Sequence, residues 1–96
     1  MRNMMLISTL VAVSMLAGSA AAAECYADYK AKQDSPLRLH YGVMQLSGPC
    51  NKQSARSELA SRLRSQGWTL LNVLTVFGPE GLQQRKANAG NYFLRY

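Results

Sequence analysis

Side chains able to do chemistry are few in this chain and widely scattered. His40 is the only histidine, and it lies two residues from Arg38 on a segment that we predict to be a strand. General acid–base catalysis needs two titratable groups within hydrogen-bond reach of one substrate, and no spacing here provides such a pair. We therefore expect His40 to be a surface residue without a catalytic role, on the polar side of its strand. We expect no catalytic residue elsewhere in the chain. The five acidic residues fall on separate segments: Glu24, Asp28, Asp34, Glu58 and Glu80.

The two cysteines, Cys25 and Cys50, are the next candidates. A redox pair is typically a Cys-x-x-Cys motif at a helix start, and structural zinc needs four converging ligands. Neither pattern is present, and no glycine-rich phosphate loop occurs, so we expect no metal and no cofactor. In an oxidising compartment an even number of cysteines indicates a disulfide. Free thiols or intermolecular pairing are the alternative.

The compartment is indicated by residues 1–23. Arg2 precedes an apolar run from Met4 to Ala17, and small residues follow up to Ala23. This is the pattern of a secretory signal peptide cleaved after Ala22 or Ala23. The alternative, a membrane anchor, would span roughly 21 Å against a hydrocarbon core of roughly 30 Å. We expect a periplasmic or secreted protein without a transmembrane anchor after cleavage.

Basic residues outnumber acidic ones by 11 to 5, giving a net charge of +6. Removal of Arg2 with the signal peptide leaves +5, which favours encounters with anionic partners. Aromatic and basic residues interleave near both ends, as in nucleic-acid binding, but export argues against nucleic acid. Simple solubility is the interpretation of the charge that we favour. If the charge serves binding, we expect an envelope protein or an anionic envelope component as partner. The candidate anion-binding residues are Arg38, Arg56, Arg62 and Arg64.

The apolar centre of the chain is the run from Trp68 to Phe77, in which both alternating residue sets are largely apolar. β-branched and aromatic residues dominate this run, and Gly67 and Gly78-Pro79 bound it. A strand with two apolar faces is covered on both sides. We therefore predict that this segment is a strand covered on both faces, against which the rest of the domain packs.

The clearest helix spans residues 51–66. Asn51 is a suitable N-cap, and Gly67 stands where a left-handed residue ends a helix. Glu58 precedes Arg62 by four residues, the favourable order for an ion pair. The stripe that we expect to face the core recurs every four residues: Ala55, Leu59 and Leu63.

The remaining segments are shorter. Residues 25–33 and 79–89 are predicted to be short helices, and Pro36 and Gly90 respectively separate them from the next segment of the chain. Residues 37–46 and 91–96 alternate as strands do. The side of the first of these strands that we expect to be buried carries Leu37, Leu39, Tyr41 and Val43.

These elements predict one α+β domain over residues 24–96: a small three-stranded sheet packed on one main helix. A strand–helix–strand crossover is right-handed and leaves its two strands parallel. The third strand, 91–96, then pairs antiparallel to them. It either lies between them, as in a split β-α-β arrangement, or at the far edge, and we favour the first.

Four stretches together resemble a family of small exported alphaproteobacterial proteins with no assigned activity: 39–43 (LHYGV), 67–73 (GWTLLNV), 76–82 (VFGPEGL) and 92–96 (YFLRY). More loosely, a helix followed by Gly-Trp and an apolar strand resembles small bacterial β-α-β-β domains of unknown function. The resemblance implies an exported α+β domain and no functional residues. Our hypothesis is a non-enzymatic binding or structural module of the cell envelope. The alternative is a small thiol- or His-dependent envelope enzyme.

Overall fold

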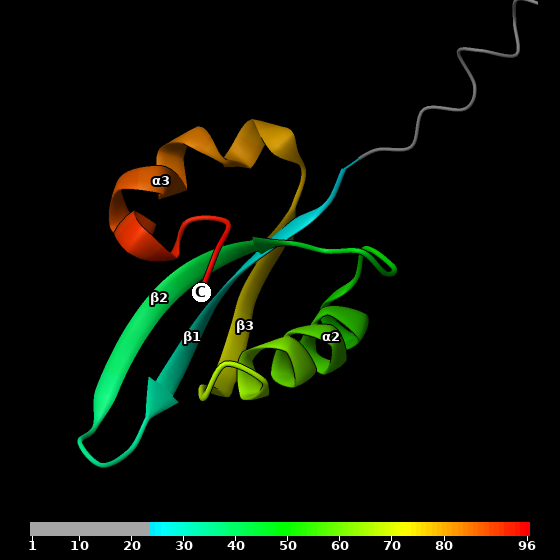
Figure 1. The fold of residues 1–96 in the computed structure, drawn as a ribbon. Coiled ribbons are helices and arrows are strands. Elements are labelled where there is room, and N and C mark those ends of the chain that lie inside the picture. Colours follow the sequence, from blue (N-terminus) through cyan, green and yellow to red (C-terminus); the bar gives the residue numbers. More distant parts are fainter. Residues whose placement is uncertain (1–23) are drawn as a thin grey trace, which may run out of the picture.

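A three-stranded antiparallel sheet forms the framework of the protein (Figure 1). The computed structural model describes residues 24–96, and the predicted signal peptide, 1–23, lies outside them. The strands are β1 (Tyr26–Gln33), β2 (Arg38–Gln45) and β3 (Thr69–Phe77), in the order β2-β1-β3. The helical elements are α2 (Lys52–Arg64), η2 (Pro79–Gly81), α3 (Gln83–Ala89) and η3 (Gly90–Tyr92).

The central strand is β1, which corrects two predictions. Residues 25–33 are not a helix, and the apolar run 68–77, predicted to be covered on both faces, is an edge strand on which Leu71 is 49% exposed. Alanine, lysine and glutamine favour helices when a segment is considered alone. Here β1 pairs with a neighbour on each side over nearly its whole length, and this pairing overrides the local propensity.

The topology confirms the α+β class and the split β-α-β arrangement. β2 and β3 are joined through α2, and both pair antiparallel to β1, which lies between them. The strand that lies between the other two is therefore β1. We predicted that residues 91–96 would occupy this position, and that prediction is wrong. Those C-terminal residues form no strand of the sheet: after η3, Phe93 makes one isolated bridge to Val43, and the Leu94 N–H donates to the Val43 carbonyl at 2.7 Å.

α2 covers one face of the sheet, as expected, and packs mainly against β3. Ala55, Leu59 and Leu63 are fully buried and form its core stripe. The Asn51 side chain accepts a hydrogen bond from the Ser54 N–H at 2.8 Å, which confirms the predicted N-cap. Gly67, with φ of 86°, ends the helical turn and directs the chain into β3.

The predicted helix at 79–89 is present as two pieces, η2 and α3, which lie over the opposite face of the sheet (Figure 1). Beneath them Tyr26, Val43 and Ala89 form a second, smaller core. A partly buried ion pair anchors α3, because Arg85 Nε donates to Asp28 Oδ2 at 3.0 Å. The other end of this face stays uncovered, and Leu39 is 65% exposed there.

The predicted buried side of β2 is covered only in part, because Val43 is buried and Tyr41 half-buried in the smaller core. Leu37 and Leu39 are exposed, whereas His40, Gly42 and Met44 face the core under α2. The physical reason is Tyr29, whose ring lies directly over Gly42 on the neighbouring strand. A glycine leaves the space that this buried ring occupies. The side of β2 that looks polar in the sequence therefore faces the core.

We predict that Gly42→Ala is destabilising. A Cβ at this position would lie 2.6 Å from Tyr29 Cζ, so the ring or the strand must shift. Overpacking of this kind costs roughly 1–3 kcal/mol. Urea unfolding would measure the loss, and Gly48→Ala is the matched control, since its Cβ would meet Glu58 at an ordinary 3.5 Å. Equal stability of the two variants would contradict the packing described here.

Cys25 and Cys50 form a disulfide, which confirms the predicted pairing and links the start of β1 to the chain just before α2. The bond closes a loop with a sequence separation of 25 residues. Chain entropy alone then predicts that the double variant Cys25→Ala/Cys50→Ala loses about 3–4 kcal/mol of unfolding free energy. Denaturant unfolding of the oxidised protein and of this variant would test the prediction. An unchanged midpoint would show that the bond does not stabilise the fold.

Candidate functional site

A groove runs between α2 and the outer side of β3. We call it the α2–β3 groove, and its volume is about 320 Å³. None of the described residues that line it is acidic. They are Arg56, Ala60 and Arg64 from α2, and Trp68, Thr69, Leu70 and Leu71 from the chain that enters β3.

The local sequence explains this arrangement. Residues four apart on a helix share one side, so Arg56, Ala60 and Arg64 form a single stripe along α2. The small side chain of Ala60 leaves space between the two arginines. At the end of the helix the Trp68 N–H donates to the Leu63 carbonyl at 2.9 Å, which turns the chain back beneath Arg64. A basic helix side therefore faces an apolar strand end.

The other two predicted anion-binding arginines have different surroundings. Arg38 is exposed, and its guanidinium carbon lies 5.9 Å from the centre of the Trp68 ring. It therefore extends the basic surface at one end of the α2–β3 groove. Arg62 lies outside the groove and is engaged within the fold.

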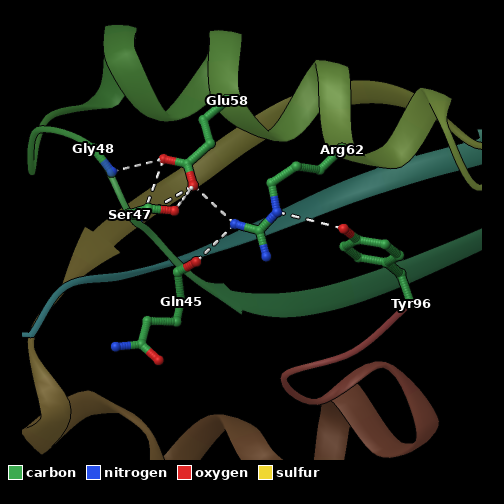
Figure 2. A network of polar contacts seen from close by, with 6 residues as sticks. All are labelled: Gln45, Ser47, Gly48, Glu58, Arg62 and Tyr96. Carbon is green, nitrogen blue, oxygen red and sulfur yellow. Dashed lines mark hydrogen bonds and ion pairs between the residues drawn. The ribbon is translucent and has the colours of Figure 1, made fainter.

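Arg62 belongs to the polar network shown in Figure 2. Its Nη1 donates to Glu58 Oε2 at 2.8 Å and to the Gln45 carbonyl at 2.9 Å. This confirms the predicted ion pair between Glu58 and Arg62. A longer hydrogen bond of 3.4 Å joins Arg62 Nε to the Tyr96 hydroxyl near the C-terminus. These contacts hold Arg62 in place, so the prediction of anion binding gains no support at this residue.

Glu58 holds the connection between β2 and α2. Its carboxylate accepts hydrogen bonds from the backbone N–H groups of Ser47 and Gly48 and from the Ser47 hydroxyl (Figure 2). Burial alone would raise the pKa of Glu58, but these hydrogen bonds and Arg62 together lower it. We interpret this network as structural, since it fixes the start of α2 and hence the position of the arginine stripe.

Arg38, Arg56 and Arg64 are exposed and form no ion pair with any residue of 24–96. Guanidinium groups bind carboxylates and phosphates through paired N–H donors. The α2–β3 groove thus offers two such groups on one wall and apolar side chains on the other. Among the four predicted residues, it brings Arg56 and Arg64 together and places Arg38 near them.

His40 is buried, which corrects the expectation of an exposed bystander. Its ring stacks on Tyr92, with centroids 3.7 Å apart, and meets the edge of Trp68 at 4.3 Å. Its Nε2 shares a hydrogen bond of 2.9 Å with the Tyr29 hydroxyl. Burial lowers the pKa of His40 to about 4, so the ring is neutral at neutral pH. We interpret His40 as an aromatic core residue with one polar contact.

Other kinds of site find less support. Both cysteines are in the disulfide. Within residues 24–96 no three or more His, Cys, Asp or Glu side chains gather as metal ligands do. No helix in the same residues has the length and apolarity to cross a membrane.

Comparisons of the chain with protein-family models, with curated proteins and with solved structures find no match. The resemblance to small exported proteins is therefore untested. What the fold and the groove define is a class by architecture: a small, disulfide-linked α+β domain with a basic groove beside an edge strand.

The sequence predicted Arg56 and Arg64 as candidates but missed the strand wall of the groove. The signal was present in the spacing of Arg56, Ala60 and Arg64, directly followed by a tight turn into Trp68. This spacing predicts a groove only if β3 is an edge strand. The apolar pattern of β3 instead indicated a strand covered on both faces.

We predict that acid destabilises the protein through His40. Because burial lowers its pKa to about 4 from 6.5, the unfolded chain takes up the proton first as the pH falls. The unfolding free energy should be highest above pH 6.5 and should fall by about 2 kcal/mol between pH 7 and pH 5. Urea unfolding at several pH values measures this. In His40→Gln the decline in this window should disappear, and an unchanged decline would assign it to other groups.

Proposed function

We propose that this protein is a non-enzymatic binding module of the cell envelope, periplasmic or secreted, that holds an anionic partner in the α2–β3 groove. The observation that carries the proposal is the pair Arg56 and Arg64, both exposed and without a carboxylate partner in the described chain, opposite an apolar wall. The partner is an envelope protein or another anionic envelope component.

The location rests on two features. A disulfide indicates an oxidising compartment, and residues 1–23 carry the pattern of a secretory signal peptide. In that compartment the available anions include acidic proteins, lipid head groups and polysaccharides. The net positive charge of the chain increases the rate of encounter with all of them.

The expected affinity is modest. Each exposed ion pair contributes roughly 0.2–1 kcal/mol, so two arginines supply at most about 2 kcal/mol. Contacts with Leu70 and the half-exposed Leu71 on the opposite wall add the apolar part of the binding energy. Binding should therefore be reversible and sensitive to salt.

The enzyme alternative gains no support from the geometry. A thiol mechanism requires a reduced cysteine, and Cys25 and Cys50 are bonded to each other. A histidine mechanism requires access to His40, which is enclosed by Tyr92 and Trp68 and has a lowered pKa. We therefore keep the binding module as the proposed function.

We predict that Arg56→Gln/Arg64→Gln weakens binding to poly-L-glutamate, used here as a generic polyanion, by about tenfold at low salt. The matched control is Lys86→Gln/Arg95→Gln, which removes the same charge at exposed sites away from the groove. Fluorescence titration or retention on immobilised poly-L-glutamate, repeated at rising salt concentration, measures the effect.

The affinity of the control variant for poly-L-glutamate should fall by less than about threefold, because a general change in net charge acts weakly at long range. Equal losses in the two variants would mean that the whole basic surface, and not the groove, attracts the polyanion. That result, or binding unaffected by either pair, would overturn the proposed function.

A further inference from the structure

The two edges of the sheet are treated differently by this fold. The outer edge of β2 is covered in part, at Val43, where Phe93 forms a bridge and the Leu94 N–H donates to the Val43 carbonyl at 2.7 Å. The outer edge of β3 has no neighbouring strand in residues 24–96. An uncovered edge presents backbone N–H and C=O groups that an extended chain can pair with.

The uncovered edge is also a side of the α2–β3 groove. Thr69, Leu70 and Leu71 contribute to its lining, and Arg56 and Arg64 stand opposite on α2. One site of about 320 Å³ thus combines the unpaired edge of β3, apolar side chains and two arginine guanidinium groups. Addition of a strand beside a helix is a common way for a domain to bind an extended peptide.

We propose that the ligand of the α2–β3 groove is an extended acidic segment of another polypeptide, which adds to the edge of β3 as a fourth strand. This deepens the proposed function and rests on it. Backbone pairing with β3 supplies much of the affinity, and Arg56 and Arg64 select for carboxylates.

The geometry also predicts the spacing of those carboxylates. Arg56 and Arg64 are eight residues apart on α2, a rise of roughly 12 Å at about 1.5 Å per residue. In a strand, residues four apart point to the same side and are roughly 13 Å apart. The segment should therefore carry acidic residues four positions apart on the side that faces α2.

The intervening positions should be apolar or β-branched. Leu71 is 49% exposed and lines both the α2–β3 groove and a second hollow, of about 240 Å³, on the uncovered part of the opposite face. An added strand beside Leu71 would cover part of its apolar surface. β3 is interrupted by two register shifts in its pairing with β1. Such bulges twist an edge, so the added segment is short.

A second copy of this chain is a poorer occupant. Two β3 edges related by a two-fold axis would each carry a flanking α2, and both helices present Arg56 and Arg64. The like charges would oppose each other across the contact. An acidic segment instead complements the two cations, which is why we favour a different polypeptide.

The test uses the purified protein and a synthetic eight-residue peptide of valine and threonine with glutamates at its second and sixth positions. Binding is followed by NMR through the backbone amides of residues 69–73. A second peptide has the same sequence with alternate backbone nitrogens methylated, which removes N–H donors and keeps the charge. A third has its two glutamates adjacent.

We expect the amide shifts to concentrate on residues 69–73 and the methylated peptide to bind at least about tenfold more weakly, because two or more backbone hydrogen bonds are lost. The peptide with adjacent glutamates should bind about threefold or more weakly than the first peptide, since it reaches one arginine instead of two. Arg56→Gln/Arg64→Gln should remove the difference between these two glutamate arrangements.

Equal affinity of the methylated and unmethylated peptides would overturn strand addition. If poly-L-glutamate binding still depended on Arg56 and Arg64, the proposed function would stand without it. Preferential binding to phosphatidylglycerol vesicles with the same arginine dependence would overturn the polypeptide ligand in favour of lipid. A stable dimer with β3 at its interface, detected by sedimentation, would overturn the proposal in favour of self-association.

Discussion

The fold depends on the burial of Tyr29 at the middle of the central strand. Its side chain is fully buried and is the largest to be so. The ring requires the open space above Gly42, and its hydroxyl requires the polar contact with His40. Burial raises the pKa of this phenol, so it remains neutral in the core. Packing of one aromatic residue thus brings His40, Gly42 and Met44 into the core under α2.

The end of the chain completes this core. Tyr92 stacks on His40 on the α2 side of the sheet, whereas Phe93, the next residue, packs into the smaller core beneath α3. The chain therefore crosses the edge of β2 between the two faces and joins the two cores. Tyr96 then reaches the Arg62 side chain. In a domain with a thin core, these terminal residues cover part of an edge that would otherwise be open.

The sequence predicts those features that depend on local spacing. Residue types at fixed separations predict the N-cap at Asn51, the stripe through Leu59 and the ion pair from Glu58 to Arg62. The disulfide was predicted from the even number of cysteines and the export signal, and the structure confirms all four. Arg56 and Arg64 were identified differently, from the basic excess of the chain, and their shared side of α2 became apparent only in the structure.

The predictions that were wrong depend on contacts between distant segments. β1 has helix-forming residues, yet pairing on both sides makes it the central strand. The apolar run of β3 indicated burial on two faces, yet Leu71 is half exposed at an edge. His40 stands in an alternating polar set, yet Tyr29 and Tyr92 enclose it. Each error has one cause: local pattern reports propensity, whereas pairing order decides which side chains meet.

The position of β3 at an edge is informative about function. An edge strand as apolar as β3 is unusual without protection, because unpaired edges promote aggregation. The fold provides partial protection through two bulges. In the proposed binding mode, Arg56 and Arg64 would add to it, because like charges oppose a second copy across the contact. The same arginines would attract an acidic strand. On this proposal the groove would select its partner by charge, with repulsion and attraction acting at one surface.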